Sequence, residues 1–426
     1  MANTLLTPTT IIRETLLLLE ATCPMLETVN TDWEQYYTGG AGGTFKKGAQ
    51  LSLRKPNRYL SLDGPTITGG QDTVEPSVNL NINQQKVIAL EFQDKDLTLT
   101  IDRFAERYLK PAVSQLRTDM EVYVNAVAKN GIFNAVGAIG TIPNTPAAFG
   151  AATQRLDEYN VPMDSRNAYL NPATMTAIRT AAATGALPAV FSQRLVEGAL
   201  LSDGSQLPYN LLNVNTYMGQ ATPQHTAGAQ GGTPVVNGAS QVGSFVVTSG
   251  WTASVTGVLL QGDVIQFGAT DAAAGAVLAC NPQTRLSTGV RACWLVTANV
   301  NSDGVGNATI PIYPAISPMS GTTAQKQQAT CMTSPLNGQT IVVVTGTASK
   351  STVNNIVMHK DCVTLAMVPM DVPEKGVIWA VQETYKGMTL RMVQAYDVLN
   401  DKRITRLDAL FGAVVQYPEL GARLIY

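Results

Sequence analysis

The chain has 426 residues, of which 45% are hydrophobic and only 14% are charged, with a formal net charge of −2. A chain of this length exceeds what one hydrophobic core usually serves, so we expect about two to four structural units. The balanced charge excludes a strongly basic protein dedicated to nucleic-acid binding. Soluble proteins average roughly 25% charged residues, and interfaces are depleted in charge at their cores. We therefore expect much of the surface to be covered, most simply by copies of the same chain.

The cysteines and the N-terminus argue against a zinc protein and an exported protein. No two cysteines form a CxxC pair and none clusters with histidine, so zinc-ligand spacing is absent. We expect free thiols in a reducing cytoplasm. A basic signal-peptide region is missing, and the apolar run 16–19 is too short to span a bilayer. The sequence predicts a soluble protein without a membrane partner. The cysteines are Cys23, Cys280, Cys293, Cys331 and Cys362.

The N-terminal segment predicts a helix followed by a hinge. Thr7-Pro8 is an N-cap followed by proline at the first helical position, and the helix should end near Cys23-Pro24. A glycine cluster comes next, and because glycines cannot pack, it predicts a flexible hinge. No register of the cluster supplies the GxxxxGK[ST] pattern of a phosphate-binding loop. The hinge residues are Gly39, Gly40, Gly42 and Gly43.

Two alternating segments, 51–54 and 78–83, predict the strands of a long hairpin with turn residues at 63–70. A two-stranded hairpin is marginal in water, so it needs a neighbour to lie on. Basic residues gather on its first strand and could bind phosphate groups or an acidic patch on a neighbouring copy. The chain is acidic overall and Tyr59 is the one nearby aromatic, so we favour the subunit contact. The basic residues are Lys46, Lys47, Arg54, Lys55 and Arg58.

The next segments change from helical to β character. An apolar stripe over 101–130 predicts a helix roughly 40 Å long, which Pro111 should kink or split and Gly131 should cap. Residues 151–217 mix helix signals with short apolar runs, as in α+β structure. From about Met218 to Gly346 charged residues almost vanish and short β-type runs dominate. This composition predicts an inserted all-β domain, either a sandwich or a barrel.

No group of residues meets the standard for a catalytic, cofactor-binding or metal site. His359 lies three residues before Cys362, but the apolar context favours a structural role over a nucleophilic dyad. We expect His225, in a Gly/Thr/Gln loop, to be exposed and inert. We expect the adjacent acids Asp157 and Glu158 to be solvated. The sequence therefore predicts a protein that is not an enzyme and has no cofactor.

Short motifs in colinear order connect the chain to one family. They are Leu5–Pro8, Gly48–Gln50, Arg54–Tyr59, Asp102–Arg107, Tyr169–Pro172, Met358–Asp361, and a C-terminal run, Tyr396–Lys402 with Arg406–Gly412 and Pro418–Arg423. In these motifs the chain resembles the gene-five-type coat family of short-tailed, double-stranded-DNA phages. Gln261–Phe267 is similar to a run in the family's inserted β-barrel. The remainder of the insert departs from the family in composition.

The resemblance implies the α+β major-capsid fold of tailed phages, the Hong Kong ninety-seven type, with an inserted barrel-like domain. It implies seven segments in chain order. They are an N-terminal arm (1–37), an extended loop (38–92), a peripheral domain with a spine helix (93–150), an axial domain (151–217), the all-β insert (218–347), an axial return (348–395) and peripheral C-terminal strands (396–426).

The resemblance also implies the function. The chain is expected to be a structural major capsid protein that self-assembles, as pentamers and hexamers, into an icosahedral shell around the phage genome. Expected partners are copies of itself, a scaffolding protein, a portal and non-specifically packaged double-stranded DNA. Assembly is expected in the host bacterial cytoplasm, and the product is the virion. The alternative is an encapsulin-like shell protein that encloses a cargo enzyme.

Overall fold

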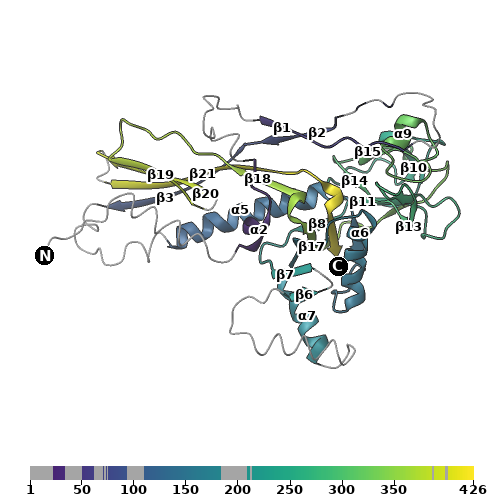
Figure 1. Cartoon of the computed structure of the whole chain (residues 1–426), viewed down its shortest axis with the longest axis horizontal. Coiled ribbons are helices and arrows are strands. Elements are labelled where there is room, and N and C mark those ends of the chain that lie inside the picture. The colour runs from purple at the N-terminus through teal and green to yellow at the C-terminus, as the bar shows by residue number, and fades with distance from the viewer. Residues whose placement is uncertain are drawn as a thin grey trace. The chain divides into compact units, whose positions relative to one another are not determined.

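The computed structural model describes residues 23–33, 50–61, 71, 73, 75–93, 110–183, 209–211, 214–385, 388–398 and 402–426. The chain forms two compact units, and Figure 1 labels their helices and strands. Unit 1 contains Met1–Leu53, Val78–Val124 and Val363–Val414, and unit 2 contains Arg54–Ser77, Asn125–Cys362 and Val415–Tyr426. These two units are coarser than the seven expected segments and do not decide their boundaries.

Unit 1 is built on a five-stranded sheet in the order β18-β21-β20-β19, with β3 paired to the other side of β21. Its alternating apolar residues point into a core in which Met392 and Leu407 contact Ala112 of a helix. This packing is what the alternation at Leu390 and Met392 predicts, because both side chains are fully buried. The strands are β3 (Gln84–Gln93), β18 (Val363–Met367), β19 (Trp379–Tyr385), β20 (Met388–Asp397) and β21 (Lys402–Val415).

The two strands predicted from alternation at 51–54 and 78–83 are present as β1 (Gln50–Arg54) and β2 (Ser77–Asn81), which pair with each other. Their inward leucines pack with Ala366 and Leu410. Close approach to β21 requires glycine at position 412, because a Cβ there would lie 2.0 Å from the Asn81 carbonyl oxygen. The strand pair therefore finds its neighbour within unit 1.

The predicted spine helix is present as α5 (Lys110–Gly131), which ends at the expected glycine. The stripe residues Leu116, Met120 and Val124 are buried. Residues 101–109 lie outside the described part, so the kink expected at Pro111 is not tested. The sequence did not predict a short helix that follows the expected first one, α2 (Pro24–Thr28). The first helix itself lies outside the described residues.

Unit 2 contains a seven-stranded sheet in the order β4-β22-β17-β5-β7-β6, with β8 paired to β17. Two helices, α6 (Pro146–Glu158) and α7 (Pro172–Ala183), accompany it, and Phe149 and Leu156 of α6 contribute to its core. The strands are β4 (Ala135–Gly137), β5 (Arg166–Leu170), β6 (Tyr209–Leu211), β7 (Val214–Met218), β8 (Gln224–Thr226), β17 (Ser351–His359) and β22 (Gly421–Ile425).

The strands of the C-terminal segment lie in two different sheets. β21 lies in the five-stranded sheet, whereas β22 lies in the seven-stranded sheet between β17 and β4. All five residues of β22 are buried, which is typical of a central strand covered on both faces. A one-turn 3₁₀ helix, η3 (Pro418–Leu420), separates β21 from β22.

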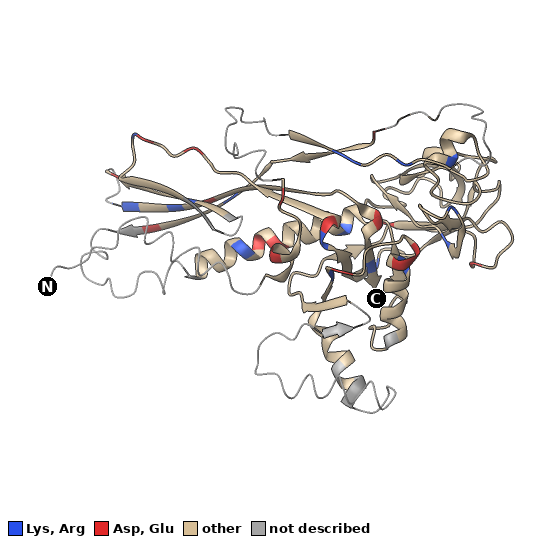
Figure 2. Ribbon diagram, viewed as in Figure 1, with Lys and Arg blue, Asp and Glu red and all other residues tan. Residues whose placement is uncertain are grey.

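The charge-poor insert forms a nearly closed, six-stranded barrel in the order β16-β11-β14-β15-β10-β9. A bridge between Val235 and Thr340 links its two ends. Trp251, Phe267 and Trp294 fill its core. Figure 2 shows that this part of the chain is nearly free of blue and red. The strands are β9 (Gly232–Val236), β10 (Gly243–Trp251), β11 (Val264–Phe267), β14 (Trp294–Val296), β15 (Ala308–Ile316) and β16 (Ile341–Val343).

A hairpin and a short helix complete the insert. The hairpin pairs β12 (Leu278–Cys280) with β13 (Ser287–Arg291), and the helix is α9 (Thr323–Gln327). The prediction of a β-rich barrel is thus confirmed, with one helical turn that composition did not reveal. Among the described helices of the whole chain, none is both long and apolar enough to cross a membrane.

Candidate functional site

The residues proposed from the sequence divide into two groups. The hinge glycines Gly39, Gly40, Gly42 and Gly43, together with Lys46 and Lys47, lie outside the described residues. The other three basic residues, Arg54, Lys55 and Arg58, lie on Arg54–Ser61, which we call the root segment. It starts at the last residue of β1 and leads toward the turn predicted at 63–70. This segment belongs to unit 2.

Each of these three basic side chains has a partner within its own chain. Arg54 pairs with Glu75 at 3.1 Å, but both side chains remain largely exposed. Arg58 pairs with Glu419 of η3 at 3.2 Å, and both side chains are mostly buried. The Lys55 ammonium lies 5.6 Å from the centre of the Tyr417 ring, close enough for a cation–π contact. The positive charges of Arg54, Lys55 and Arg58 therefore already interact with groups of unit 2.

Backbone hydrogen bonds fix the root segment further. The amide of Lys55 donates to the Pro76 carbonyl at 2.8 Å, and the side chain of Gln327 in α9 donates to the Arg58 carbonyl at 2.7 Å. Gln71 contacts Leu60 twice, once as acceptor and once as donor. The root segment is thus held by the insert and by η3, which no local sequence signal predicts because Arg58 and Glu419 are 361 residues apart.

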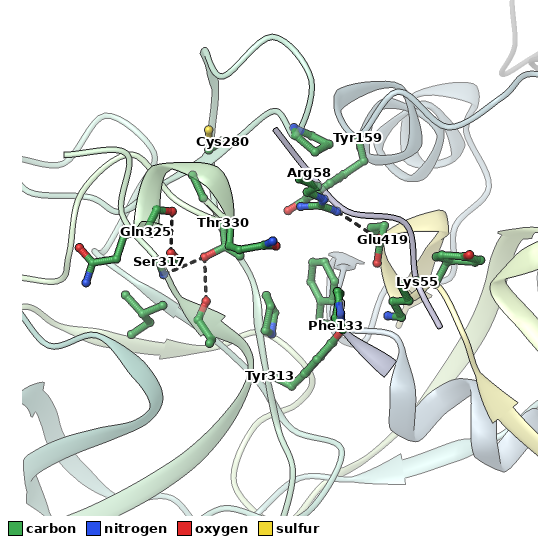
Figure 3. A pocket seen from close by; sticks show the side chains of 18 of the residues that line it. Lys55, Arg58, Phe133, Tyr159, Cys280, Tyr313, Ser317, Gln325, Thr330 and Glu419 are labelled. Atoms are coloured by element: carbon green, nitrogen blue, oxygen red, sulfur yellow. Dashed lines mark hydrogen bonds and ion pairs between the residues drawn. The ribbon is translucent and has the colours of Figure 1, made fainter. Parts of the chain in front are cut away.

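The root segment forms one wall of a cavity of about 600 Å³ (Figure 3). The other walls come from β10, β12, β15 and α9 of the insert, from Phe133 and Tyr159, and from η3. Phe133 packs edge-on against Tyr159 and Tyr313, with ring centroids 5.8 Å and 6.3 Å apart. Most of the lining is aromatic, proline or aliphatic, so the cavity suits an apolar group.

Burial shifts the pKa values of several titratable groups that line the cavity. Burial raises the pKa of the Tyr159 and Tyr313 phenols and of the Cys280 thiol, so all three stay neutral at physiological pH. Burial also lowers the pKa of Lys55, and the nearby Glu419 carboxylate opposes this effect. A protonated thiol and two protonated phenols offer no activated nucleophile.

A buried polar network lies where the insert joins the seven-stranded sheet. Asp263, which is fully buried, accepts a hydrogen bond from the Leu260 amide at 2.8 Å and from the Gly228 amide at 3.1 Å. It also contacts His225 at 2.8 Å and the Thr345 hydroxyl at 3.1 Å. Four protein groups thus satisfy this one carboxylate.

Arg423 of β22 extends the network into the seven-stranded sheet. Its Nη1 donates to the Gly262 carbonyl at 3.0 Å. Burial lowers the pKa of Arg423 from 12.5 to about 10, while the Asp263 charge acts in the opposite direction. An arginine without solvent access is stable only beside acceptors and negative charge. We therefore regard the Asp263 network as the anchor of the insert on the sheet.

The expectation that His225 is exposed is wrong. Its side chain is 3% exposed and bonded to Asp263. The reason is long-range pairing, because β8 places His225 opposite Thr352 of β17. The only sequence hint was the similarity of the Gln261–Phe267 run, which contains Asp263, to a family motif.

Two further expectations concern other titratable residues. The expected solvation of Glu158 is wrong, because it pairs with Arg155 at 3.2 Å and its side chain is only 10% exposed. Asp157 pairs with Arg166 at 2.7 Å but stays half-exposed. The carboxylates at the end of α6 are therefore fixed by neighbouring arginines.

The pair His359 and Cys362 behaves as packed structure. The Nδ1 of His359 accepts a hydrogen bond from the Asp361 amide at 3.2 Å, and burial lowers the pKa of His359. Burial raises the pKa of the Cys362 thiol, which is fully enclosed. A thiol in that state is a poor nucleophile. Within the described ranges, no group of three or more His, Cys, Asp or Glu residues could hold a metal ion.

The comparisons with known proteins point to one family. A family model described as "P22 coat protein - gene protein 5" matches residues 3–425. No curated protein matches the chain. Similar solved structures include one titled "Mycobacterium phage Che8", with 12% identity, 94% of this chain and 89% of that chain covered, and a TM-score of 0.44. Another is "Capsid of Ralstonia phage GP4", with 7% identity, 91% and 87% covered, and a TM-score of 0.40.

Proposed function

This chain belongs to the P22 coat protein family and is a structural, shell-forming capsid protein of the virion, and from this premise we propose how it forms its shell. Many copies assemble, as pentamers and hexamers, into an icosahedral shell that encloses a phage double-stranded DNA genome. The observation that carries the proposal is the family match over residues 3–425. The encapsulin-like alternative is not favoured by that match.

The physical properties of the chain support assembly with copies of itself. Only 14% of the residues are charged, which suits surfaces that become buried between subunits. The glycine cluster at 39–43 suits a hinge whose angle changes during assembly. Because the family implies a structural role, catalysis is not part of the proposal.

The root segment fixes the part of the proposed extended loop that lies between β1 and the turn predicted at 63–70. Lys55 contacts the Tyr417 ring and Arg58 pairs with Glu419. Of the proposed contact residues, these two therefore use their charges inside unit 2. Arg54 has a side chain that is 79% exposed despite its pairing with Glu75. We assign the contact with a neighbouring subunit to Arg54, Lys46 and Lys47, and the hinge to Gly39, Gly40, Gly42 and Gly43.

Other proposed partners follow from the same premise. A scaffolding protein and a portal take part in assembly in the bacterial cytoplasm, and the packaged DNA contacts the shell without sequence specificity. The net charge of −2 supports weak, non-specific contact, because strong phosphate binding needs a clustered excess of Lys and Arg.

The test is to produce the chain in bacteria, with and without the scaffolding protein, and to measure its sedimentation and its appearance in negative stain. We expect capsomers or closed shells of uniform size. A stable monomer under both conditions would contradict the proposed function. Replacing Gly39, Gly40, Gly42 and Gly43 by proline should block shell assembly while the hydrogen exchange of β11 and β22 stays unchanged, and normal shells would refute the hinge.

A further inference from the structure

The outer face of the barrel carries an apolar surface that lacks a partner among the described residues. Along β10 its members alternate with core residues. Phe245 is 60% exposed and Val247 is 42% exposed, whereas the residues that follow each of them, Val246 and Thr248, are fully buried. Val242, just before the strand, is 47% exposed. Together with Pro311 and Tyr313 of β15, these residues form what we call the β10 patch.

Strand pairing makes the β10 patch one continuous surface. Phe245 lies opposite Pro311 and Val247 lies opposite Thr309. Tyr313 follows two residues after Pro311 and therefore points to the same face. Val242, Tyr313 and Pro314 also line the cavity of about 600 Å³, so the patch leads directly into that cavity.

The same face of the barrel is covered at one end and open at the other. Tyr313 pairs with Leu295 of β14, and Leu295 is buried together with Phe133 and Ile425. Beyond Tyr313 the face continues to Phe245 and Val247, which no described residue covers. The β10 patch thus lies on the same barrel face as Leu295, which is buried inside unit 2, but is itself exposed. Contiguous exposed apolar surface of this kind marks interaction sites.

The patch is also held in a fixed shape. The Gln241 side chain accepts a hydrogen bond from the Val247 amide at 2.7 Å and donates to the Val247 carbonyl at 3.0 Å. It donates to the Asn237 carbonyl at 2.9 Å as well. Since the strand is already ordered, a partner can bind without a large cost for ordering it.

We propose that the β10 patch and the adjoining cavity bind an apolar segment of a second copy of this chain. This proposal rests on the proposed shell function, which places identical copies side by side. Charge argues for a copy rather than for nucleic acid, because β9, β10 and β15 contain no Lys, Arg, Asp or Glu, and phosphate contacts need cations. Charge depletion is instead the mark of the core of a protein interface.

A double variant, Phe245→Gln with Val247→Gln, tests the patch. Both side chains are exposed, so the fold should be unchanged, as checked by hydrogen exchange of the barrel. The matched control is Leu286→Gln, which alters a side chain that is 68% exposed on the β12–β13 hairpin. We expect the double variant to need at least about tenfold more protein for assembly and the control to assemble as the wild type does.

The outcomes separate this proposal from the shell function itself. Shells from the double variant at the wild-type concentration overturn the patch and leave the shell function intact, and so does an equal loss in the control. A wild-type chain that never assembles overturns both. A photo-reactive benzoylphenylalanine at position 245 of assembled particles should link to a peptide of a second copy. Links only to another protein, or only within one chain, would rule out a second copy as the occupant.

Discussion

The five-stranded sheet of unit 1 and the insert of unit 2 each bury one aspartate completely, and they stabilise it in different ways. Asp408 of β21 pairs with Arg391 at 2.5 Å and with Arg406 at 2.6 Å. Asp263 accepts its hydrogen bonds from two backbone amides, a hydroxyl and His225. In unit 1, two arginine charges neutralise the Asp408 carboxylate. In unit 2, the Asp263 carboxylate is stabilised mainly by the dipoles of two backbone amides and a hydroxyl group.

The two arrangements differ in what remains when the carboxylate is lost. The Arg391 and Arg406 side chains are 15% and 44% exposed, so water can solvate them. Three of the partners of Asp263 (His225, Gly228 and Thr345) are buried, as is Arg423 beside it, and these groups would be left without acceptor or countercharge. Buried polar groups without partners are more costly than exposed ones. The charge-poor insert therefore depends more on its one buried carboxylate than the charge-rich sheet does.

The largest effect is expected for Asp263→Ala. It removes the acceptor for four groups and the negative charge beside Arg423, so the free energy of unfolding of the barrel should fall by about 3–5 kcal/mol. Native-state hydrogen exchange of β11 and β16 measures it. The matched control is Asp271→Ala, since that carboxylate is 45% exposed and pairs with Arg291, and it should cost less than about 1 kcal/mol. Equal losses in the two variants would refute the anchor.

Asp408→Ala should be less harmful, because its arginines can be hydrated. We expect a loss of about 1–3 kcal/mol, measured by hydrogen exchange of β20 and β21. Lys402→Ala is the control in the same sheet, since Lys402 and its partner Glu91 are both exposed. A larger loss for Asp408→Ala than for Asp263→Ala would reverse the comparison.

Arg58→Ala tests whether the root segment is anchored in unit 2. The pair with Glu419 is partly buried, so its loss should cost about 1 kcal/mol and raise hydrogen exchange at Leu60 and Lys55. Arg54→Ala removes a pair that is largely exposed and should leave that exchange unchanged. The anchor is wrong if both variants give the wild-type exchange pattern.

The smallest effect on stability is expected from protonation of Asp303 in the barrel at low pH. Hydrogen bonds from the Asn307 and Val305 amides hold the pKa of this carboxyl below its ordinary value of 3.8. Because the folded pKa is depressed, its contribution to stability is complete above pH 3.8 and is lost as pH falls through the folded pKa. The difference in unfolding midpoint between the wild type and Asp303→Asn should shrink below pH 3.8. A difference that is constant with pH would contradict this assignment.

Local patterns predicted much of the fold. Alternation at Leu51 and Leu53 predicted β1, the apolar stripe at Leu116 and Met120 predicted α5, and Gly131 marked its end. Composition alone revealed the insert, because charged residues almost vanish and short β-type runs dominate from about Met218 to Gly346. These features depend on neighbours within a few residues, so the sequence contains them directly.

The functional contacts depend on residues far apart in the chain and were not predictable in the same way. The burial of His225 follows from its pairing with Thr352, which is 127 residues away. The root-segment anchor joins Arg58 to Glu419, and β22 leaves the sheet of β21 after only a short turn. The β10 patch was hidden as well, since Phe245 and Val247 are ordinary strand residues until pairing shows that their face is open.

The most direct test is an electron cryo-microscopy reconstruction of particles assembled from this chain. We predict an icosahedral shell in which the β10 patch, with Phe245 and Val247, is covered by a second copy. Particles without icosahedral order, or a shell in which that face stays open to solvent, would contradict this prediction.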